Sequence, residues 1–258
     1  MECEIPKIIH YCWFGGNELS DLAKKCIDSW KKYFPEYKII EWNENNFDIN
    51  CCQYVQDAYK EKKWAHVSDY ARFYVLYQYG GIYFDTDVEV INSYDNILKE
   101  GAFMGCERWD GGIATGLGFG VEKSNSFMKK ILEDYEKSSF YDEKGEADIY
   151  NTVVVRVTNL MTQAGYIPNY EPQRVNGIVI YPKDYFNPMI YETGVLDITS
   201  NTKSIHWYDA SWFPKGDKKI HLVEQKIRVK FKYPLSNIFC FIYRKGYRLL
   251  EFLHIIKK

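Results

Sequence analysis

The apolar positions of this chain follow two patterns: short unbroken runs, and longer stretches in which they recur every three or four residues. Short runs bounded by turn residues predict strands, and the longer stretches predict helices. The predicted strands cover 7–13, 37–42, 82–84, 88–91, 102–107, 116–121, 179–181 and 204–206. The predicted helices cover 20–33, 51–62, 65–79, 126–137 and 150–164. Because strands and helices alternate, we expect an α/β fold with a mixed, mostly parallel sheet.

The most informative segment is 65–90, where a predicted helix is followed by two acidic residues. One face of that helix carries Ala65, Asp69, Arg72 and Leu76. Two glycines at 80–81 end the helix, and the apolar run at 82–84 predicts a buried strand. This strand places Asp85 at its end, and Asp87 points the same way if the chain stays extended.

Two carboxylates at the end of a buried strand suit a hard divalent cation, which prefers oxygen ligands and often shares them with phosphates. An isolated Asp-x-Asp is more often a solvated turn, however. An Asp and an Arg three residues apart are more often a surface ion pair, worth about 0.2–0.5 kcal/mol. The fixed order of Asp69, Arg72, Asp85 and Asp87 within an apolar stretch favours a binding site, because unpaired buried charges are costly.

Other candidate residues also lie at predicted strand ends, where ligands of α/β sheets bind. Trp13 offers a stacking face for a nucleobase, and Gly15 with its neighbouring glycine lets a backbone approach a ligand. His206 follows the last apolar strand, although a single His is more often a core or surface residue. Both interpretations of His206 stay open.

The charge is unevenly distributed along the 258 residues, which suffice for one large domain. The net charge is −2, yet nine Lys or Arg stand against the single Glu251 from Lys226 onward. This argues against nucleic acid as a partner of the core and for a basic tail that contacts an anionic surface. We expect a main domain over 1–218 and a basic amphipathic helical extension over 219–258.

The tail carries a helical apolar stripe with basic flanks. It either lies on an anionic membrane leaflet or packs on the main domain with a solvated basic edge. The stripe consists of Phe239, Ile242, Tyr243, Tyr247, Leu250 and Leu253, flanked by Arg244, Lys245, Arg248 and Lys257.

The sequence shows neither a basic start with an apolar run nor roughly 18 uninterrupted apolar residues. Its seven cysteines lack the spacing of a metal site, and reduced thiols explain them most simply. We therefore expect a cytoplasmic protein, peripheral on the inner face of the cell membrane if the tail binds lipid.

Three blocks resemble the family 32 glycosyltransferases, which carry an Asp-x-Asp motif in their sugar-binding region. They read IPKIIHYCWFGG at 5–16, AHVSDYAR at 65–72 and GGIYFDTD at 80–87. A fourth, HWYDASW at 206–212, resembles the C-terminal block of the family, although many members have a second His before the Trp. The family includes yeast-type mannosyltransferases, bacterial capsule and lipopolysaccharide mannosyl-, galactosyl- or glucosyltransferases and, more distantly, clostridial glucosylating toxins.

The resemblance implies a GT-A-like fold over 1–218, a Rossmann-type nucleotide-diphospho-sugar transferase domain. It also implies Mn²⁺ or Mg²⁺ as cofactor and a UDP- or GDP-linked sugar as donor. The implied catalytic residues are Asp69, Arg72 and Asp87. The implied metal ligands are Asp85, Asp87 and His206. The implied donor-binding residues are Trp13, Gly15, Ala65, Asp69, Arg72, Asp85, Ser211 and Trp212.

The expected function is therefore metal-dependent, retaining transfer of a hexose to a glycan or polyprenyl-linked acceptor in surface polysaccharide biosynthesis. Retention by double displacement needs a carboxylate near the anomeric carbon, and the sequence offers no defensible candidate. We expect attack on the face that the diphosphate leaves. Two alternatives remain: a metal-dependent nucleotidyltransferase or nucleotide-sugar hydrolase, and a non-catalytic glycan-binding module.

Overall fold

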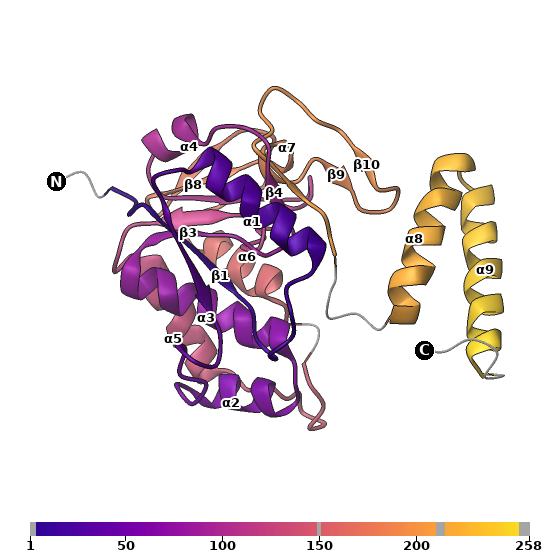
Figure 1. The fold of residues 1–258 in the computed structure, drawn as a ribbon, viewed down its shortest axis with the longest axis horizontal. Helices are drawn as coiled ribbons and strands as arrows, with labels where there is room; N and C mark the ends of the chain where they lie inside the picture. Colours follow the sequence, from indigo (N-terminus) through magenta and orange to yellow (C-terminus); the bar gives the residue numbers. More distant parts are fainter. Residues whose placement is uncertain (1–3, 149–150, 210–214, 253–258) are drawn as a thin grey trace. The chain divides into compact units, whose positions relative to one another are not determined.

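Most short apolar runs of the sequence become strands of one sheet in the computed structural model, which describes residues 4–148, 151–209 and 215–252 (Figure 1). The strands are β1 (Ile8–Cys12), β2 (Lys38–Trp42), β3 (Gly81–Tyr83), β5 (Phe103–Gly105), β6 (Phe119–Val121), β7 (Gln173–Val175) and β8 (Ile178–Tyr181). Their order is β2-β1-β3-β6-β5-β8-β7, with only β6 and β7 antiparallel to their neighbours. This confirms the predicted mixed, mostly parallel sheet.

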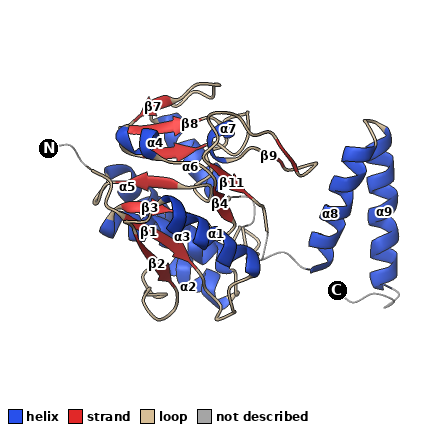
Figure 2. Ribbon diagram, turned by 45° about the horizontal axis from the view of Figure 1, so that its top comes forward, coloured by secondary structure: helices blue, strands red, loops and turns tan. Residues whose placement is uncertain are grey.

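Helices cover both faces of this sheet (Figure 2). The helices are α1 (Asp21–Tyr33), α2 (Gln53–Lys60), α3 (Trp64–Tyr79), α4 (Asp95–Lys99), α5 (Ser126–Lys137), α6 (Val153–Gln163) and α7 (Lys183–Phe186). Because alternate strand residues point to opposite faces, the sheet has two apolar cores. One core packs against α2, α3, α5 and α6, and the other against α1, α4 and α7.

The helix and strand that flank the acidic pair form where the sequence predicts them. Helix α3 ends at Gly80 as predicted, and the φ of 65° there lies in the positive range that favours glycine. Helices α4 and α7 were not predicted, because five and four residues are too few to show a helical period. Edge strand β7 was missed because it contains the polar residues Gln173 and Arg174.

A separate two-stranded sheet joins the acidic pair to a distant part of the chain. Strand β4 (Val88–Val90) pairs antiparallel with β11 (Ser204–His206), and His206 lies opposite Val88. This register places His206 next to the residue that precedes β4.

Contacts divide the chain into one unit of Met1–Pro188 with Ile198–Trp207 and a second of Met189–Asp197 with Tyr208–Lys258. The second unit contains the short strands β9 (Met189–Ile190) and β10 (Val195–Leu196) and the helices α8 (Lys215–Lys230) and α9 (Leu235–Phe252). The predicted boundary at 218/219 falls within α8 and stays a prediction. Across the described ranges, no helix combines the length and apolar character that crossing a bilayer requires.

His10, in the first motif block, is a core residue. Its Nε2 lies 2.9 Å from Gly80 O, and its Nδ1 accepts a hydrogen bond of 3.0 Å from Trp42 Nε1. The imidazole is fully buried, and burial lowers its pKa to about 4. His10 therefore ties β1 to β2 and to the end of α3 in its neutral form.

This burial predicts a pH-dependent loss of stability. The unfolded chain takes up a proton near pH 6.5, whereas folded His10 does so only near pH 4, so stability falls as pH drops through that window. The loss attributable to His10 should reach about 3 kcal/mol. Urea unfolding at pH 7 and pH 4.5 should show a shallower pH dependence for His10→Gln than for the wild type. Equal slopes would contradict the assignment.

Candidate functional site

The chain turns directly after β3, at the two acidic residues predicted to bind a cation. The Asp85 N–H donates to Gly116 O at 3.0 Å, and the Val88 N–H donates to Asp85 O at 3.1 Å. The second bond closes a turn over residues 85–88. From the sequence we expected the two carboxylates to point the same way if the chain stayed extended from Asp85 to Asp87. The turn shows that the chain is not extended there, and the two carboxylates have different partners.

Asp85 is bound to Arg72, which projects from α3 and also binds Asp69. Arg72 Nη2 is 2.9 Å from Asp69 Oδ1 and 3.2 Å from Asp85 Oδ1. Arg72 Nη1 donates to Thr115 Oγ1 at 3.3 Å, and Nε donates to Ser68 O at 3.2 Å. Arg72 and Asp69 are both buried. The solvated surface ion pair considered from the sequence is therefore excluded.

The charges of this cluster stabilise one another. Burial opposes the charge on Arg72, but Asp85 and Asp69 outweigh it and raise the pKa of the guanidinium. Burial raises the pKa of the Asp69 carboxyl, while Arg72 and His66 lower it. The Tyr83 hydroxyl donates to Asp85 Oδ1 at 3.0 Å, and its ring centroid lies 4.9 Å from Arg72 Cζ.

The donors of Arg72 are directed mainly at protein acceptors, since four of its hydrogen bonds or ion-pair contacts end on Ser68, Asp69, Asp85 and Thr115. A guanidinium has five N–H donors. Arg72 therefore fixes the orientation of the two carboxylates. The predicted binding of donor-sugar hydroxyls by Arg72 and by Asp69 stays a prediction.

Asp87 lies beside His206, as the pairing of β4 with β11 requires. Asp87 Oδ1 is 3.2 Å from His206 Nε2, and the Asp87 carbonyl accepts the Trp207 N–H at 2.9 Å. Burial opposes a proton on His206, but Asp87 and, more weakly, Asp85 raise the pKa of the imidazole. The structure thus brings together two of the three predicted metal ligands.

The Asp87–His206 pair fits one edge of a divalent-ion site. Two donors each about 2.1 Å from an octahedral ion lie about 3 Å apart, near the observed 3.2 Å. Throughout the described residues, no group of three or more His, Cys, Asp or Glu side chains is placed to hold a metal. Asp85 therefore does not complete a three-residue cage, and its predicted contact with the ion stays a prediction. Mg²⁺ commonly takes only one or two carboxylates and completes its shell with phosphates and water.

A further carboxylate, Glu107, lies just beyond the end of β5 and close enough to His206 to interact with its charge. Burial raises the pKa of the Glu107 carboxyl, while Arg108 and then His206 lower it. Its backbone is fixed on both sides, by Gly112 O at 2.9 Å and Asn187 Nδ2 at 2.8 Å. Strand β5 runs parallel to β3, so Glu107 and Asp85 follow strands that end at the same edge of the sheet.

The glycine turn after β1 packs against an indole that the sequence argument did not single out. Gly15 has a φ of 92°, and a Cβ there would lie 2.6 Å from Trp64 Nε1. The Gly15 N–H donates to Glu44 Oε1 at 2.6 Å. Trp13 is half-buried, and its Nε1 donates to Asn17 O at 2.7 Å. Trp64 and Glu44 gave no sequence signal, because only the fold brings them to this turn.

The last three predicted donor-binding residues are Ala65, Ser211 and Trp212. Ala65 lies in the first turn of α3 and is half-buried. Ser211 and Trp212 lie outside the described residues. Their roles stay predictions.

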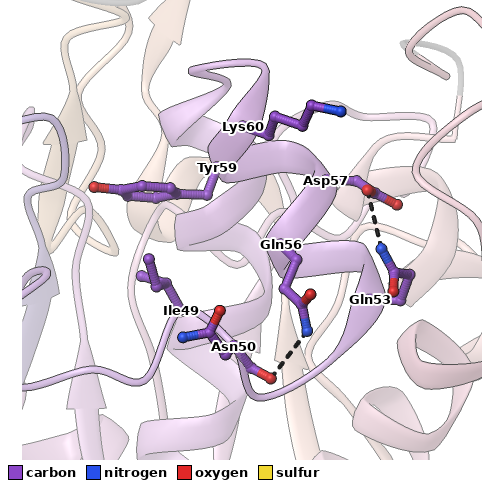
Figure 3. A pocket seen from close by; sticks show the side chains of 7 residues that line it. All are labelled: Ile49, Asn50, Gln53, Gln56, Asp57, Tyr59 and Lys60. Atoms are coloured by element: carbon purple, nitrogen blue, oxygen red, sulfur yellow. Dashed lines mark hydrogen bonds between the residues drawn. The ribbon is translucent and has the colours of Figure 1, made fainter.

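A shallow cavity of about 360 Å³ lies elsewhere, along α2 and the loop before it (Figure 3). Figure 3 shows two of its amides already engaged: Gln53 Nε2 donates to Asp57 Oδ1 at 3.0 Å, and Gln56 Nε2 donates to Asn50 O at 3.1 Å. Its lining residues are Ile49, Asn50, Gln53, Gln56, Asp57, Tyr59 and Lys60. None of them is a predicted site residue. We therefore place the candidate site at Asp85 and Asp87 and not at this cavity.

Residues 20–104 match the family described as a glycosyltransferase sugar-binding region containing DXD motif. This span includes Asp69, Arg72, Asp85 and Asp87, but not β11 or the second unit. The resemblance predicted from the sequence is therefore confirmed over this span, and the class of enzyme that it defines is the glycosyltransferases.

Two curated relatives carry mannosyltransferase-type names. Inositol phosphoceramide mannosyltransferase 3 of Schizosaccharomyces pombe is 27% identical over 148 residues, 53% of this chain and 38% of that protein. Mannosyl phosphorylinositol ceramide synthase CSH1 of Saccharomyces cerevisiae is 29% identical over 143 residues, 52% of this chain and 37% of that protein. The matched part thus spans well under half the length of these relatives.

Among solved structures, the chain is similar to a glycosyltransferase involved in the glycosylation of the major capsid of PBCV-1. The TM-score is 0.45 and the identity 13%, over 84% of this chain and all of that one.

The Arg72 cluster makes a prediction about stability. Arg72→Met should lower the free energy of unfolding by about 3–5 kcal/mol, because Asp69 and Asp85 lose the cation between them. Adding Asp69→Asn should recover part of that loss by removing one buried charge. Urea unfolding measures both. The control is Arg108→Met, whose pair with Asp110 is exposed, and which should change stability by less than about 1 kcal/mol. Equal losses in the single and double variants would contradict the charge argument.

Proposed function

We propose that this protein transfers a hexose from a nucleotide-diphosphate sugar to a hydroxyl of a glycan or polyprenyl-linked acceptor. The observation that carries the proposal is the arrangement of the acidic pair. Asp85 is held by Arg72, Asp87 lies 3.2 Å from His206, and the segment belongs to a sugar-binding region. The names of both curated relatives support mannose as the first donor sugar to test.

Each residue of the arrangement has a defined part in the proposed reaction. Asp87 and His206 would hold Mn²⁺ or Mg²⁺, which supplies charge neutralisation for the departing diphosphate when bound. Arg72 and Tyr83 orient Asp85, whose carboxylate would coordinate the ion or accept a hydrogen bond from the ribose. Asp69 orients donor hydroxyls, and such positioning lowers the barrier by restricting the donor to a reactive geometry.

The remaining roles rest on the family resemblance. Trp13 stacks on the base beside Gly15 and Ala65, while Ser211 and Trp212 contact the diphosphate. The configuration at the anomeric carbon is retained. The acceptor oxygen bonds to the anomeric carbon on the face from which the diphosphate oxygen departs, and the leaving diphosphate takes up the hydroxyl proton, so the reaction needs no carboxylate nucleophile.

The proposed setting is surface polysaccharide biosynthesis, such as that of capsule or lipopolysaccharide, on the cytoplasmic side of the cell membrane. The basic second unit supports a peripheral position there, because polyprenyl-linked acceptors stay at the bilayer. Residues from Lys226 onward carry nine Lys or Arg against one acidic residue.

A donor screen tests the proposal directly. The wild-type protein should melt at a higher temperature with Mn²⁺ and either GDP-mannose or a UDP-hexose, and it should glycosylate a polyprenyl-linked or oligosaccharide acceptor. Release of pyrophosphate or of a sugar phosphate would indicate a nucleotidyltransferase or hydrolase instead. Glycan affinity that survives chelation and Asp87→Ala would indicate a binding module.

Asp87→Asn should remove the Mn²⁺-dependent part of the melting shift and slow transfer roughly 100-fold or more, since a bound cation contributes several kcal/mol to charge stabilisation. Asp28→Asn is the matched control, because the Asp28 side chain is exposed on α1 and pairs only with Lys31 among the ion pairs of the described chain. Wild-type transfer by Asp87→Asn would refute the role of this carboxylate.

A further inference from the structure

Within the second unit, helix α9 exposes an apolar face. Five large side chains on it are more than half exposed, among them Phe241 at 62% and Leu249 at 57%. At about 100° per residue, the five fall within an arc of about 120°. They are Leu235, Ile238, Phe241, Ile242 and Leu249, and we call this set the α9 face.

The opposite side of α9 packs against α8, beside which it lies in Figure 1. Cys240, Tyr247 and Glu251 of α9 are buried, as are Ile220 and Glu224 of α8. The predicted tail stripe is thus corrected at Tyr247, which is buried in the helix pair instead of lying with the exposed Ile242. The predicted residues Leu253 and Lys257 lie outside the described residues.

Ion pairs fix which side of α9 is buried. Arg244 binds the buried Glu224 with two hydrogen bonds of 2.8 and 2.6 Å. Arg248 Nη1 donates to Glu251 at 2.7 Å, and Arg248 also pairs with Asp217 of α8. These two arginines hold the helices together. Rotating α9 to bury its apolar face would break their contacts, so the exposed face is a fixed property of the pair.

The unit that carries this face is strongly basic. Residues 215–252 include ten Lys or Arg and three Asp or Glu. Lys226, Lys230, Lys232 and Lys245 take part in none of the ion pairs of the described chain. Two of these lysines lie near aromatic rings, Lys245 at 5.7 Å from the Phe241 centroid and Lys230 at 5.6 Å from that of Phe231. At about 100° per residue, Lys245 falls within the arc of the α9 face, and apolar residues next to a lysine are typical of helices at a bilayer interface.

We propose that the α9 face is the membrane-docking surface of this protein and that its occupant is an anionic lipid bilayer. The apolar side chains enter the interfacial region while Lys245 contacts lipid phosphates, and the net positive charge of residues 215–252 adds to the attraction at longer range. The excess of positive charge favours lipid over a second copy of the chain, whose equally basic face would repel it. This inference refines the peripheral location proposed above, and it can be tested without any donor sugar.

Vesicle sedimentation with the full-length protein tests the inference. Wild-type protein should bind vesicles of phosphatidylcholine with phosphatidylglycerol and bind phosphatidylcholine alone much more weakly. Phe241→Ser with Leu249→Ser should weaken binding to anionic vesicles roughly tenfold or more, because two apolar side chains no longer insert. Lys245→Glu should weaken it by roughly tenfold as well, and only on anionic vesicles.

The matched control is Ile167→Ser with Tyr170→Ser, which removes two equally exposed apolar side chains from the other unit and should leave vesicle binding unchanged. All variants should keep the wild-type melting shift with Mn²⁺ and donor, so a failed donor screen and a failed docking surface are distinguishable. The inference is overturned if wild-type protein ignores anionic vesicles, or if Phe241→Ser with Leu249→Ser binds them normally. It is also overturned if sedimentation velocity shows a dimer that this double variant dissociates while vesicle binding stays intact.

Discussion

The site depends on one guanidinium between two carboxylates. Arg72 comes from helix α3, Asp85 from the end of strand β3, and Thr115 from the loop before β6, so this side chain joins three segments. Burying charges is costly unless they are paired and hydrogen-bonded, and here Arg72 meets both conditions with Asp69 and Asp85. The ion pair keeps the Asp85 carboxylate in place before any ligand arrives, which is how a preorganised site lowers the cost of binding.

The second acidic residue, Asp87, is positioned by different contacts. Asp87 follows a turn and faces His206, which reaches it only because β11 pairs with β4. The two aspartates of one short motif are thereby assigned separate tasks: Asp85 is committed to Arg72 and Tyr83, whereas Asp87 lies with an imidazole at a spacing suited to a cation. Glu107 interacts with His206 from the end of β5, so two strands of the main sheet, β3 and β5, are followed by acidic groups at the same edge.

The sequence predicts the local parts of this arrangement and misses the parts that depend on tertiary contacts. The helix at α3, its end at Gly80 and the acidic pair after β3 follow from periodicity and glycine chemistry within one segment. The turn at 85–88 was missed, because alternation alone cannot distinguish a bend from a continuing strand. Trp64 and Glu44 beside Gly15 were missed because only the folded sheet brings them together. In α9 both sides carry apolar residues, so its orientation depends on a tertiary contact with Glu224 of α8, which periodicity within α9 cannot show.

In the proposed site, Asp87 and His206 form the cation-binding edge while Asp85 stays paired with Arg72. Anomalous scattering from a crystal grown with Mn²⁺ and a nucleoside diphosphate measures this most directly. We expect a manganese peak within bonding distance of Asp87 Oδ1 and His206 Nε2, with the Arg72–Asp85 pair intact. Manganese bound elsewhere, or at Asp85 with Arg72 displaced, would contradict it.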